Sequence, residues 1–358
     1  MNKIGILTLG LKDNYGGILQ TVALYSFLEK NGFQPKLIRK YPIQKKWKLL
    51  ATKFFEVLPF QNYKNIRLSN IKFKKNTNFL NTNMPNQSGV FNYKFEIENY
   101  INNEEINSLI VGSDQVWRYA YINDSEYDTY FLNLNLSNKV KKIAYAASFG
   151  VSYWEAPEKI NEIKKYLADF DAVSVREQSG LDICINDFMY KNPKLVLDPT
   201  LLVNKDLYDN FIFDNDKYHK DCVTYILDQS VQKEKVVNNI FKKLNVKTSN
   251  NLYDQSSYYS IEEWVTYIAK SNFVVTDSFH GMVFSIIFNK QFIVLLNEER
   301  GVDRFYSLCN QLGLTNRLIK ANSDFSMDFN VIDYKEVNLK LEQLKKDSFD
   351  FIISALSG

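Results

Sequence analysis

Short hydrophobic runs alternate along the chain with segments whose hydrophobic residues recur at helical spacing. The first run, Lys3–Thr8, predicts a buried strand, and the hydrophobic positions between Ile18 and Phe27 predict a helix that ends at Asn31-Gly32. A second strand is predicted over Pro35–Arg39. Because a strand, a helix and a second strand follow one another, we expect a parallel sheet with a right-handed crossover.

The same alternation continues towards the C-terminus and predicts an α/β fold throughout. Further strands are predicted at Leu109–Val111, Ile143–Ala147, Ala172–Val175, Leu195–Leu197, Val223–Leu227, Phe273–Thr276 and Phe292–Leu295. Further helices are predicted at Glu158–Ala168, Gln178–Ile185, Val231–Leu244, Ile261–Lys270, Gly281–Phe288, Asp303–Leu312 and Tyr334–Ala355.

A chain of 358 residues is long for a single core, so we expect two domains. The predicted organisation is an N-terminal α/β domain over residues 1–203, a polar linker over 204–221 and a C-terminal α/β domain over 222–358. The last helix is expected to pack back on the N-terminal domain. Domains of this kind bind ligands at the carboxyl ends of their strands, in the cleft between them.

The composition narrows the classes of function. Hydrophobic residues make up 45% of the chain and charged residues 24%, as in soluble globular proteins, and no hydrophobic run reaches the roughly 18 residues of a membrane span. The N-terminal segment is too short and too soon polar for a signal peptide, so we expect a cytoplasmic protein. The spacing of Cys184, Cys222 and Cys309 and of the two histidines does not suit a metal site, so we expect buried thiols and no bound metal or cofactor. A Mg²⁺ ion bound by carboxylates stays open.

Positive charge is concentrated near the N-terminus. Residues 36–75 carry twelve Lys or Arg and one acid, interleaved with aromatic residues, which gives this stretch a charge of +11 in a chain of net charge +3. A solvated insertion over about residues 40–84, with its aromatic residues packed inward, is the simplest interpretation. Docking on an anionic membrane surface comes next, which would place the protein peripherally at the inner face of the membrane. Nucleic acid is the least favoured, and we expect no such partner.

A loop rich in glycine joins the first strand to the first helix, at the usual position of a ligand loop in an α/β fold. Gly16 and Gly17 let the backbone approach a bound group closely, and the Asn14 and Gln20 amides could hydrogen-bond sugar hydroxyls. The spacing matches neither the dinucleotide-binding nor the P-loop pattern. A tight turn followed by a helix N-cap is the structural alternative.

Two more polar motifs follow predicted strands. Asp114 could accept hydrogen bonds from sugar hydroxyls and Trp117 could stack on a pyranose, or Ser113 or Asp114 could simply cap a helix. Arg176 follows another strand, where its guanidinium could bind a phosphate or carboxylate or form a structural pair with a nearby acid.

His280, one of only two histidines, lies where a predicted strand meets a predicted helix. Backbone N–H groups at a helix start attract anions, and an imidazole can exchange a proton near neutral pH. A helix N-terminus contributes only about 0.3–1 kcal/mol to anion binding, so cations must help. Arg300 and Arg304 are the candidates downstream. A structural role for His280 is the alternative.

Taken together, these motifs occur in the order and spacing of the polysaccharide pyruvyl transferase family, which the chain resembles over nearly its whole length. The matching motifs are Asn14-Tyr15-Gly16-Gly17 with Leu19-Gln20 and Ala23-Leu24, Gly112 to Trp117, Tyr145 to Gly150, Ser174 to Glu177, Asp198 to Leu202 and Thr276 to Gly281.

The resemblance implies two Rossmann-like domains in a GT-B-like arrangement with a ligand cleft between them. It implies phosphoenolpyruvate as the donor and a sugar of a glycan or lipid-linked precursor as the acceptor, with a pyruvate ketal as the product. Such chemistry is typical of bacterial exopolysaccharide and capsule synthesis.

The resemblance also implies roles for particular residues. His280 would be the acid/base, and the donor would be bound by Arg176, Ser278, Gly281, Arg300 and Arg304. The acceptor would be bound by Asn14, Tyr15, Gly16, Gly17, Gln20, Ser113, Asp114 and Trp117. Another branch of the family has an arginine where this chain has Ser278. Either Arg300 or Arg304 substitutes for that cation, or the donor sits differently here.

Two other functions stay open on this scaffold. A GT-B glycosyltransferase would use a nucleotide sugar, but the second half of the chain shows no clear glutamate-rich signature for reading a nucleotide. A protein that binds glycans without catalysis is the other alternative.

Overall fold

The computed structural model describes residues 2–12, 14–42, 64–122, 126–253, 258–297, 301–320 and 330–357, with side chains from residue 71 onward in the segment that begins at 64. The chain divides into two compact units. Unit 1 comprises Met1–Val203 and Lys345–Gly358, and unit 2 comprises Asn204–Leu344. Residues 43–63, which carry much of the predicted basic insertion, lie outside the described residues.

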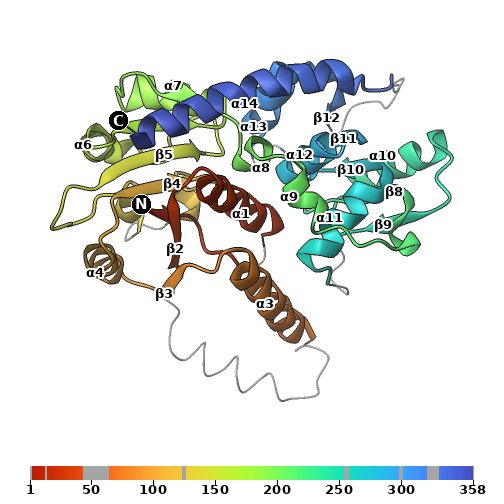
Figure 1. The fold of residues 1–358 in the computed structure, drawn as a ribbon. Helices are drawn as coiled ribbons and strands as arrows, with labels where there is room; N and C mark the ends of the chain where they lie inside the picture. The colour runs from red at the N-terminus through yellow and green to blue at the C-terminus, as the bar shows by residue number, and fades with distance from the viewer. Residues whose placement is uncertain are drawn as a thin grey trace. The chain divides into compact units, whose positions relative to one another are not determined.

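Unit 1 is built on a seven-stranded sheet with the order β3-β2-β1-β4-β5-β6-β7 (Figure 1). Its strands are β1 (Lys3–Leu7), β2 (Gln34–Lys40), β3 (Gln87–Phe91), β4 (Ser108–Gly112), β5 (Lys141–Ala147), β6 (Ala172–Val175) and β7 (Lys194–Leu195). Every pairing between them is parallel. The chain builds outward from β1 to β3 and then crosses to the other side of β1 at β4, so the switch point of the sheet lies between β1 and β4. Open parallel sheets bind ligands at the carboxyl edge of that point.

Helices cover both faces of this sheet, which explains why strands β1, β4 and β6 near its centre are largely hydrophobic and buried. On one face, Ile97, Ile101, Ile163 and Leu167 join the core that contains Leu109. On the other face, the rings of Phe27 and Phe349 meet edge to face at 5.7 Å. The helices of unit 1 are α1 (Tyr15–Lys30), α3 (Lys64–Asn83), α4 (Lys94–Glu104), α5 (Tyr127–Tyr130), α6 (Ile160–Ala168), α7 (Gln178–Asp182), α8 (Pro199–Leu202) and the C-terminal part of α14 (Tyr334–Ser357).

Helix α1 follows the local signals in the sequence. Asn14 is its N-cap, and the Asn14 side chain accepts a hydrogen bond from the Gly17 N–H. The helix ends at Lys30, and Gly32 then adopts a φ of 83°, which glycine accommodates without strain. The predicted stop at Asn31-Gly32 is confirmed.

Unit 2 is built on a five-stranded parallel sheet with the order β12-β11-β10-β8-β9. Its strands are β8 (Lys220–Tyr225), β9 (Ser249–Asn251), β10 (Ser271–Thr276), β11 (Gln291–Leu296) and β12 (Leu318–Lys320). Its helices are α9 (Asp206–Asp209), α10 (Val231–Lys243), α11 (Ile261–Lys270), α12 (Phe279–Ile287) and α13 (Asp303–Leu312), with the first part of α14. After β9 the chain crosses to the other side of β8, so β8 and β10 flank the switch point of this sheet.

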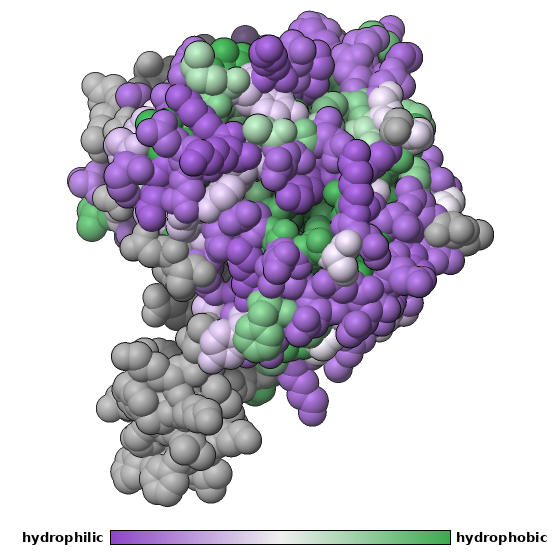
Figure 2. Space-filling model, turned by 90° about the vertical axis from the view of Figure 1, so that its left-hand side faces the viewer, coloured by the Kyte–Doolittle hydropathy of each residue, from purple (hydrophilic) through white to green (hydrophobic). Residues whose placement is uncertain are grey.

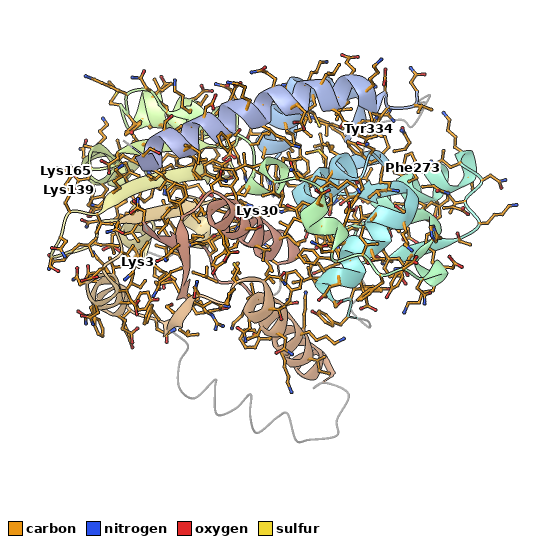
Figure 3. All side chains as sticks on the ribbon, viewed as in Figure 1. Lys3, Lys30, Lys139, Lys165, Phe273 and Tyr334 are labelled. Atoms are coloured by element: carbon orange, nitrogen blue, oxygen red, sulfur yellow. The ribbon has the colours of Figure 1, made fainter. Side chains whose placement is uncertain are left out.

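The core of unit 2 also has two faces. Phe273 of β10, labelled in Figure 3, packs with Cys222, Val236 and Ile240 on the face that α10 covers. On the other face, the ring of Trp264 meets Tyr225 at 5.3 Å and Phe284 at 5.2 Å. The strands and helices predicted in this half are confirmed to within a few residues at their ends.

Some elements differ from those predicted. Strand β3 and helices α3 and α4 were not expected, because β3 is a polar edge strand and α3 and α4 have few hydrophobic residues. The polar stretch 204–221 was expected to be a linker, but it packs with unit 2. Within it, Tyr208 is fully buried and its ring lies 4.9 Å from Phe284.

The three cysteines are free and buried, as expected. Burial raises the pKa of Cys222 and Cys309 to about 12, which keeps these thiols protonated. No helix among the described residues is long and hydrophobic enough to cross a membrane. The face of the molecule in Figure 2 is mostly hydrophilic, with hydrophobic residues gathered near its centre.

The cap of α11 tests how local signals stabilise unit 2. Ser260 Oγ accepts from the Glu263 N–H (3.2 Å), and Glu263 Oε2 accepts from the Ser260 N–H (2.9 Å). We expect Ser260→Ala to lower the free energy of unfolding of unit 2 by about 1 kcal/mol, measured by urea denaturation. Asn238→Ala, at an exposed position in the middle of α10, should not lower it. Equal losses in both variants would contradict the capping role.

Candidate functional site

The loops after β1 and β4 meet at the switch point of unit 1. Asn14 Nδ2 donates to Asp114 Oδ2 at 2.9 Å, and the Asn14 Oδ1 accepts from the Gly17 N–H at 3.0 Å. A Cβ on Gly17 would lie 2.9 Å from Asn14 Nδ2 and 3.2 Å from Asp114 Oδ2. Any larger residue at position 17 would therefore push the Asn14–Asp114 pair apart.

The remaining residues of this loop have mainly structural contacts. Tyr15 and Gly16 are buried in the first turn of α1. Gln20 is fully buried, where Oε1 accepts from the Ser113 N–H (3.1 Å) and Nε2 donates to the Gly17 carbonyl (2.9 Å). The Gln20 amide thus joins α1 to the loop after β4, and it does not face a ligand as the sequence suggested.

Ser113 and Trp117 also lie away from any surface that a sugar could reach. Ser113 is fully buried and donates to Asp198 Oδ2 at 3.2 Å. Trp117 is fully buried, its Nε1 donates to the Tyr130 carbonyl, and its ring stacks on Phe131 at 5.1 Å. The structure corrects the expected stacking on a pyranose, because the hydrophobic core covers the indole.

Arg176 is enclosed by carboxylates. Its side chain is 1% exposed, and it forms ion pairs with Asp198 Oδ2 (2.8 Å), Asp114 Oδ1 (3.4 Å) and Glu177 Oε2 (3.8 Å). Burial by itself lowers the pKa of Arg176, but the three carboxylates outweigh it and raise the pKa above its ordinary value. The structural pair considered for Arg176 is the arrangement observed, and its guanidinium does not present a fork to an external anion.

The partners of Arg176 extend the cluster to other loops. Glu177 Oε1 accepts from the N–H groups of Phe149 (2.7 Å) and Gly150 (3.2 Å), which follow β5. Burial raises the pKa of Glu177, although Arg176 and these hydrogen bonds oppose the shift. Asp198 Oδ1 accepts from the Thr200 N–H at 3.0 Å and caps α8. Sequence reasoning quoted Asp198 and Glu177 within motifs but gave neither a role at the site.

Asp114 is the member of this cluster that reaches solvent. Its side chain is 10% exposed, whereas those of Asp198 and Glu177 are 0% exposed. Arg176, Asn14 and the Gln115 N–H, which donates to Asp114 Oδ1 at 2.9 Å, fix its carboxylate. An oriented, partly exposed carboxylate at a switch point can accept hydrogen bonds from ligand hydroxyls.

The strand–turn–helix segment at the end of β10 forms as the sequence predicts. Ser278 is the N-cap of α12, and its Oγ accepts from the Gly281 N–H at 3.4 Å. Thr276 Oγ1 accepts from the Ser278 N–H (3.0 Å) and donates to the Tyr225 carbonyl (2.7 Å). A Cβ on Gly281 would lie 2.3 Å from Thr276 Oγ1, so only glycine fits against the strand end.

Asp277 fastens this turn across the switch point of unit 2. Its carboxylate accepts from the Leu227 N–H (2.7 Å) and the Asp228 N–H (3.1 Å), and forms an ion pair with Lys233 Nζ at 2.6 Å. Lys233, in the first turn of α10, is 6% exposed. No sequence signal distinguished this lysine from the many on helix surfaces, because its burial depends on tertiary packing.

His280 lies in the first turn of α12 and is 6% exposed. The neighbouring ring of Phe279 is 5.4 Å away, edge to face. The guanidinium of Arg304 lies 5.6 Å from the centres of both the Phe279 and the Phe305 rings, which brings a cation close to this turn. Arg300, the other expected cation, lies outside the described residues.

Comparison with known protein families identifies the class of protein that carries these two sites. The model of the family described as "Polysaccharide pyruvyl transferase" matches residues 14–299. The chain belongs to this family. The match begins at Asn14 of the unit 1 loop and continues past the His280 turn of unit 2. A search of curated proteins found no significant match.

Solved structures share the fold. The S. aureus MnaA-UDP co-structure has a TM-score of 0.51 at 12% identity and covers 98% of this chain and 90% of that chain. A putative UDP-N-acetylglucosamine 2-epimerase from Listeria monocytogenes has a TM-score of 0.52 at 10% identity and covers 99% and 89%. The expected fold class, two Rossmann-like α/β units of the GT-B type, is confirmed.

The buried ion pairs of Arg176 give a testable expectation for stability. Arg176→Met would leave Asp114, Asp198 and Glu177 without their cation. We expect the free energy of unfolding of unit 1 to fall by roughly 3–5 kcal/mol in urea denaturation. Lys346→Met removes a cation from an exposed pair with Asp350 in the same unit and should change it by less than about 0.5 kcal/mol. If Arg176→Met lowered the free energy of unfolding by no more than Lys346→Met does, the structural role of Arg176 would be refuted.

Proposed function

We propose that this protein transfers pyruvate from phosphoenolpyruvate to two hydroxyls of a sugar, which forms a pyruvate ketal on a glycan or a lipid-linked precursor. The observation that carries the proposal is the match of the family model from the Asn14 loop past the His280 turn. We further propose that the protein acts in the bacterial cytoplasm, on exopolysaccharide or capsule precursors.

The proposed reaction needs a proton carrier. A first sugar hydroxyl adds to C2 of phosphoenolpyruvate while C3 gains a proton, so the C3 methylene of the enol phosphate becomes a methyl group. A second hydroxyl then attacks C2, the bond from C2 to the phosphate oxygen breaks, and inorganic phosphate leaves with the electron pair. His280, at the start of α12, is suited to deliver the proton to C3 and to take one from a hydroxyl.

The proposed donor site is the turn from Ser278 to Gly281. The N-terminus of α12 contributes only about 0.3–1 kcal/mol towards an anion, whereas each charge-assisted hydrogen bond adds about 1.5–3 kcal/mol. The charge of Lys233 is already neutralised by Asp277. Arg304, held against Phe279, is therefore the described cation that we assign to the donor, with Arg300 as a second candidate.

The proposed acceptor site centres on Asp114. Its carboxylate is partly exposed and oriented by Arg176 and Asn14, so it can accept a hydrogen bond from an attacking hydroxyl. Tyr15, Gly16 and Gly17 supply the loop that holds Asn14 in place. Gln20, Ser113 and Trp117 are left out of the proposed site because they are buried in structural contacts.

The two histidines provide a matched pair of variants. We expect His280→Gln to lower phosphate release from phosphoenolpyruvate with a lipid-linked saccharide mixture by roughly 100- to 10,000-fold, because the proton carrier is lost. The melting temperature should stay close to that of the wild type. His219→Gln changes the other, exposed histidine and should leave the rate unchanged. Turnover near the wild-type level in His280→Gln would rule out the acid/base role.

A thermal-shift panel tests the donor. Phosphoenolpyruvate should raise the melting temperature of the wild type by mass action, and Arg304→Met should abolish the shift. Lys320→Met, which removes an exposed cation of the same unit, should retain it. Stabilisation by UDP-sugars in place of phosphoenolpyruvate would favour a nucleotide-sugar glycosyltransferase. Stabilisation by neither donor, with glycan binding retained, would favour a non-catalytic glycan-binding protein.

A further inference from the structure

A group of cations and aromatic rings lies beside the Asn14 loop, on the β1–β2 side of the unit 1 switch point. Lys12 Nζ lies 5.9 Å from the centre of the Tyr41 ring and 6.0 Å from that of Phe73. Arg39 Cζ lies 5.9 Å from the Tyr41 ring, and Lys72 Nζ lies 4.9 Å from the Tyr15 ring. We call Lys12, Tyr15, Arg39, Tyr41, Lys72 and Phe73 the cation–aromatic cluster.

The cluster is assembled from four parts of the chain, one of which is Tyr15 at the start of α1. Lys12 belongs to the loop after β1, Arg39 and Tyr41 to the end of β2, and Lys72 and Phe73 to α3. Asn76 of α3, which is buried, donates to the Lys12 carbonyl at 2.7 Å. The Tyr41 hydroxyl donates to the Leu11 carbonyl at 3.3 Å. These bonds fix the backbone beneath the cations, so their arrangement belongs to the fold of unit 1.

Two cations of the cluster, Lys12 and Arg39, are available to an anion. Among the described residues, Lys12 and Arg39 form no ion pair, and the buried Nε of Arg39 has no hydrogen-bond partner. A cavity of about 10 Å³ lined by Thr8–Leu11 and Leu37–Tyr41 has room for a single water molecule. A larger ligand would therefore bind over the side chains of the cluster, where Phe73 is 36% exposed.

We propose that the cation–aromatic cluster binds a phosphate group of the acceptor, as in a sugar linked through a phosphate or diphosphate ester. Lysine and arginine together suit a dianion, and an exposed ring beside them offers a face to a sugar or to an alkyl chain. The cluster adjoins the acceptor loop through Tyr15, which follows Asn14 directly. This inference rests on the proposed function, since it assigns the acceptor to Asn14 and Asp114.

The same chemistry could serve phosphate head groups in a bilayer. Helix α3 continues from the cluster with exposed Ile71, Lys74 and Lys75, so a membrane surface offers a second source of phosphate. The two sources differ in what they require. An acceptor phosphate would bind as a soluble ligand, whereas head groups would bind only in vesicles with anionic lipid.

The experiment measures binding of inorganic diphosphate by titration calorimetry, in an Arg304→Met background that suppresses binding at the proposed donor turn. Lys12→Met and Arg39→Met should each weaken the binding by about 10- to 100-fold, the effect of one charge-assisted bond. Lys165→Met, on α6 and labelled in Figure 3, removes an exposed cation outside the cluster and should have no effect. A parallel series measures binding to vesicles of phosphatidylcholine with and without phosphatidylglycerol.

Each outcome is decisive. Loss of diphosphate binding in the cluster variants supports an acceptor phosphate, and loss of anionic-vesicle binding alone assigns the cluster to lipid head groups. The proposal is overturned if the Lys12 and Arg39 variants bind both probes as tightly as the Arg304→Met parent does. It is also overturned if that parent binds neither probe. In the otherwise wild-type protein, the thermal shift with phosphoenolpyruvate should survive Lys12→Met. If phosphoenolpyruvate gives no shift while the cluster still binds diphosphate, the proposed donor fails and the phosphate site stands.

Discussion

The buried charge of Arg176 is the constraint on which the loops at the carboxyl edge of the unit 1 sheet depend. Its guanidinium is paired with carboxylates that follow β4 and β6 and that cap α8, and each carboxylate in turn binds another segment. Asp114 contacts the loop after β1, and Glu177 binds the backbone after β5. Buried carboxylates are stable only when they are paired and hydrogen-bonded, so removing the cation would loosen all of these loops together.

Unit 2 uses the same physical solution at its own switch point. Asp277 joins the end of β10 to the loop after β8 and takes its counter-charge from Lys233. In each unit a buried ion pair fixes the loops beside the groups that we propose to bind a ligand. These are Asp114 and the cation–aromatic cluster in unit 1, and the first turn of α12 with His280 and Arg304 in unit 2. Rigid loops reduce the entropy that binding would otherwise cost.

Sequence reasoning succeeded where a signal is local. The hydrophobic runs of β1 and β10, the stop of α1 at Asn31-Gly32 and the turn at Ser278 all depend on neighbours in sequence, and they formed as predicted. It failed where a role depends on burial. Gln20 and Trp117 have the side chains of ligand-binding residues, but α1 and the hydrophobic core enclose them. Lys233 looks like any surface lysine and is instead the counter-ion of Asp277.

The sequence by itself determined the α/β class, the family and the positions of the loops between strand ends and helix starts, because short, local patterns mark both. Tertiary structure alone decided what the charged residues do. Arg176 could have bound a ligand or an acid, and only the convergence of Asp114, Glu177 and Asp198 from distant segments made it an internal counter-ion. The same convergence left only a tenth of the Asp114 side chain exposed, since the energy of a charge depends on its surroundings and not on its neighbours in sequence.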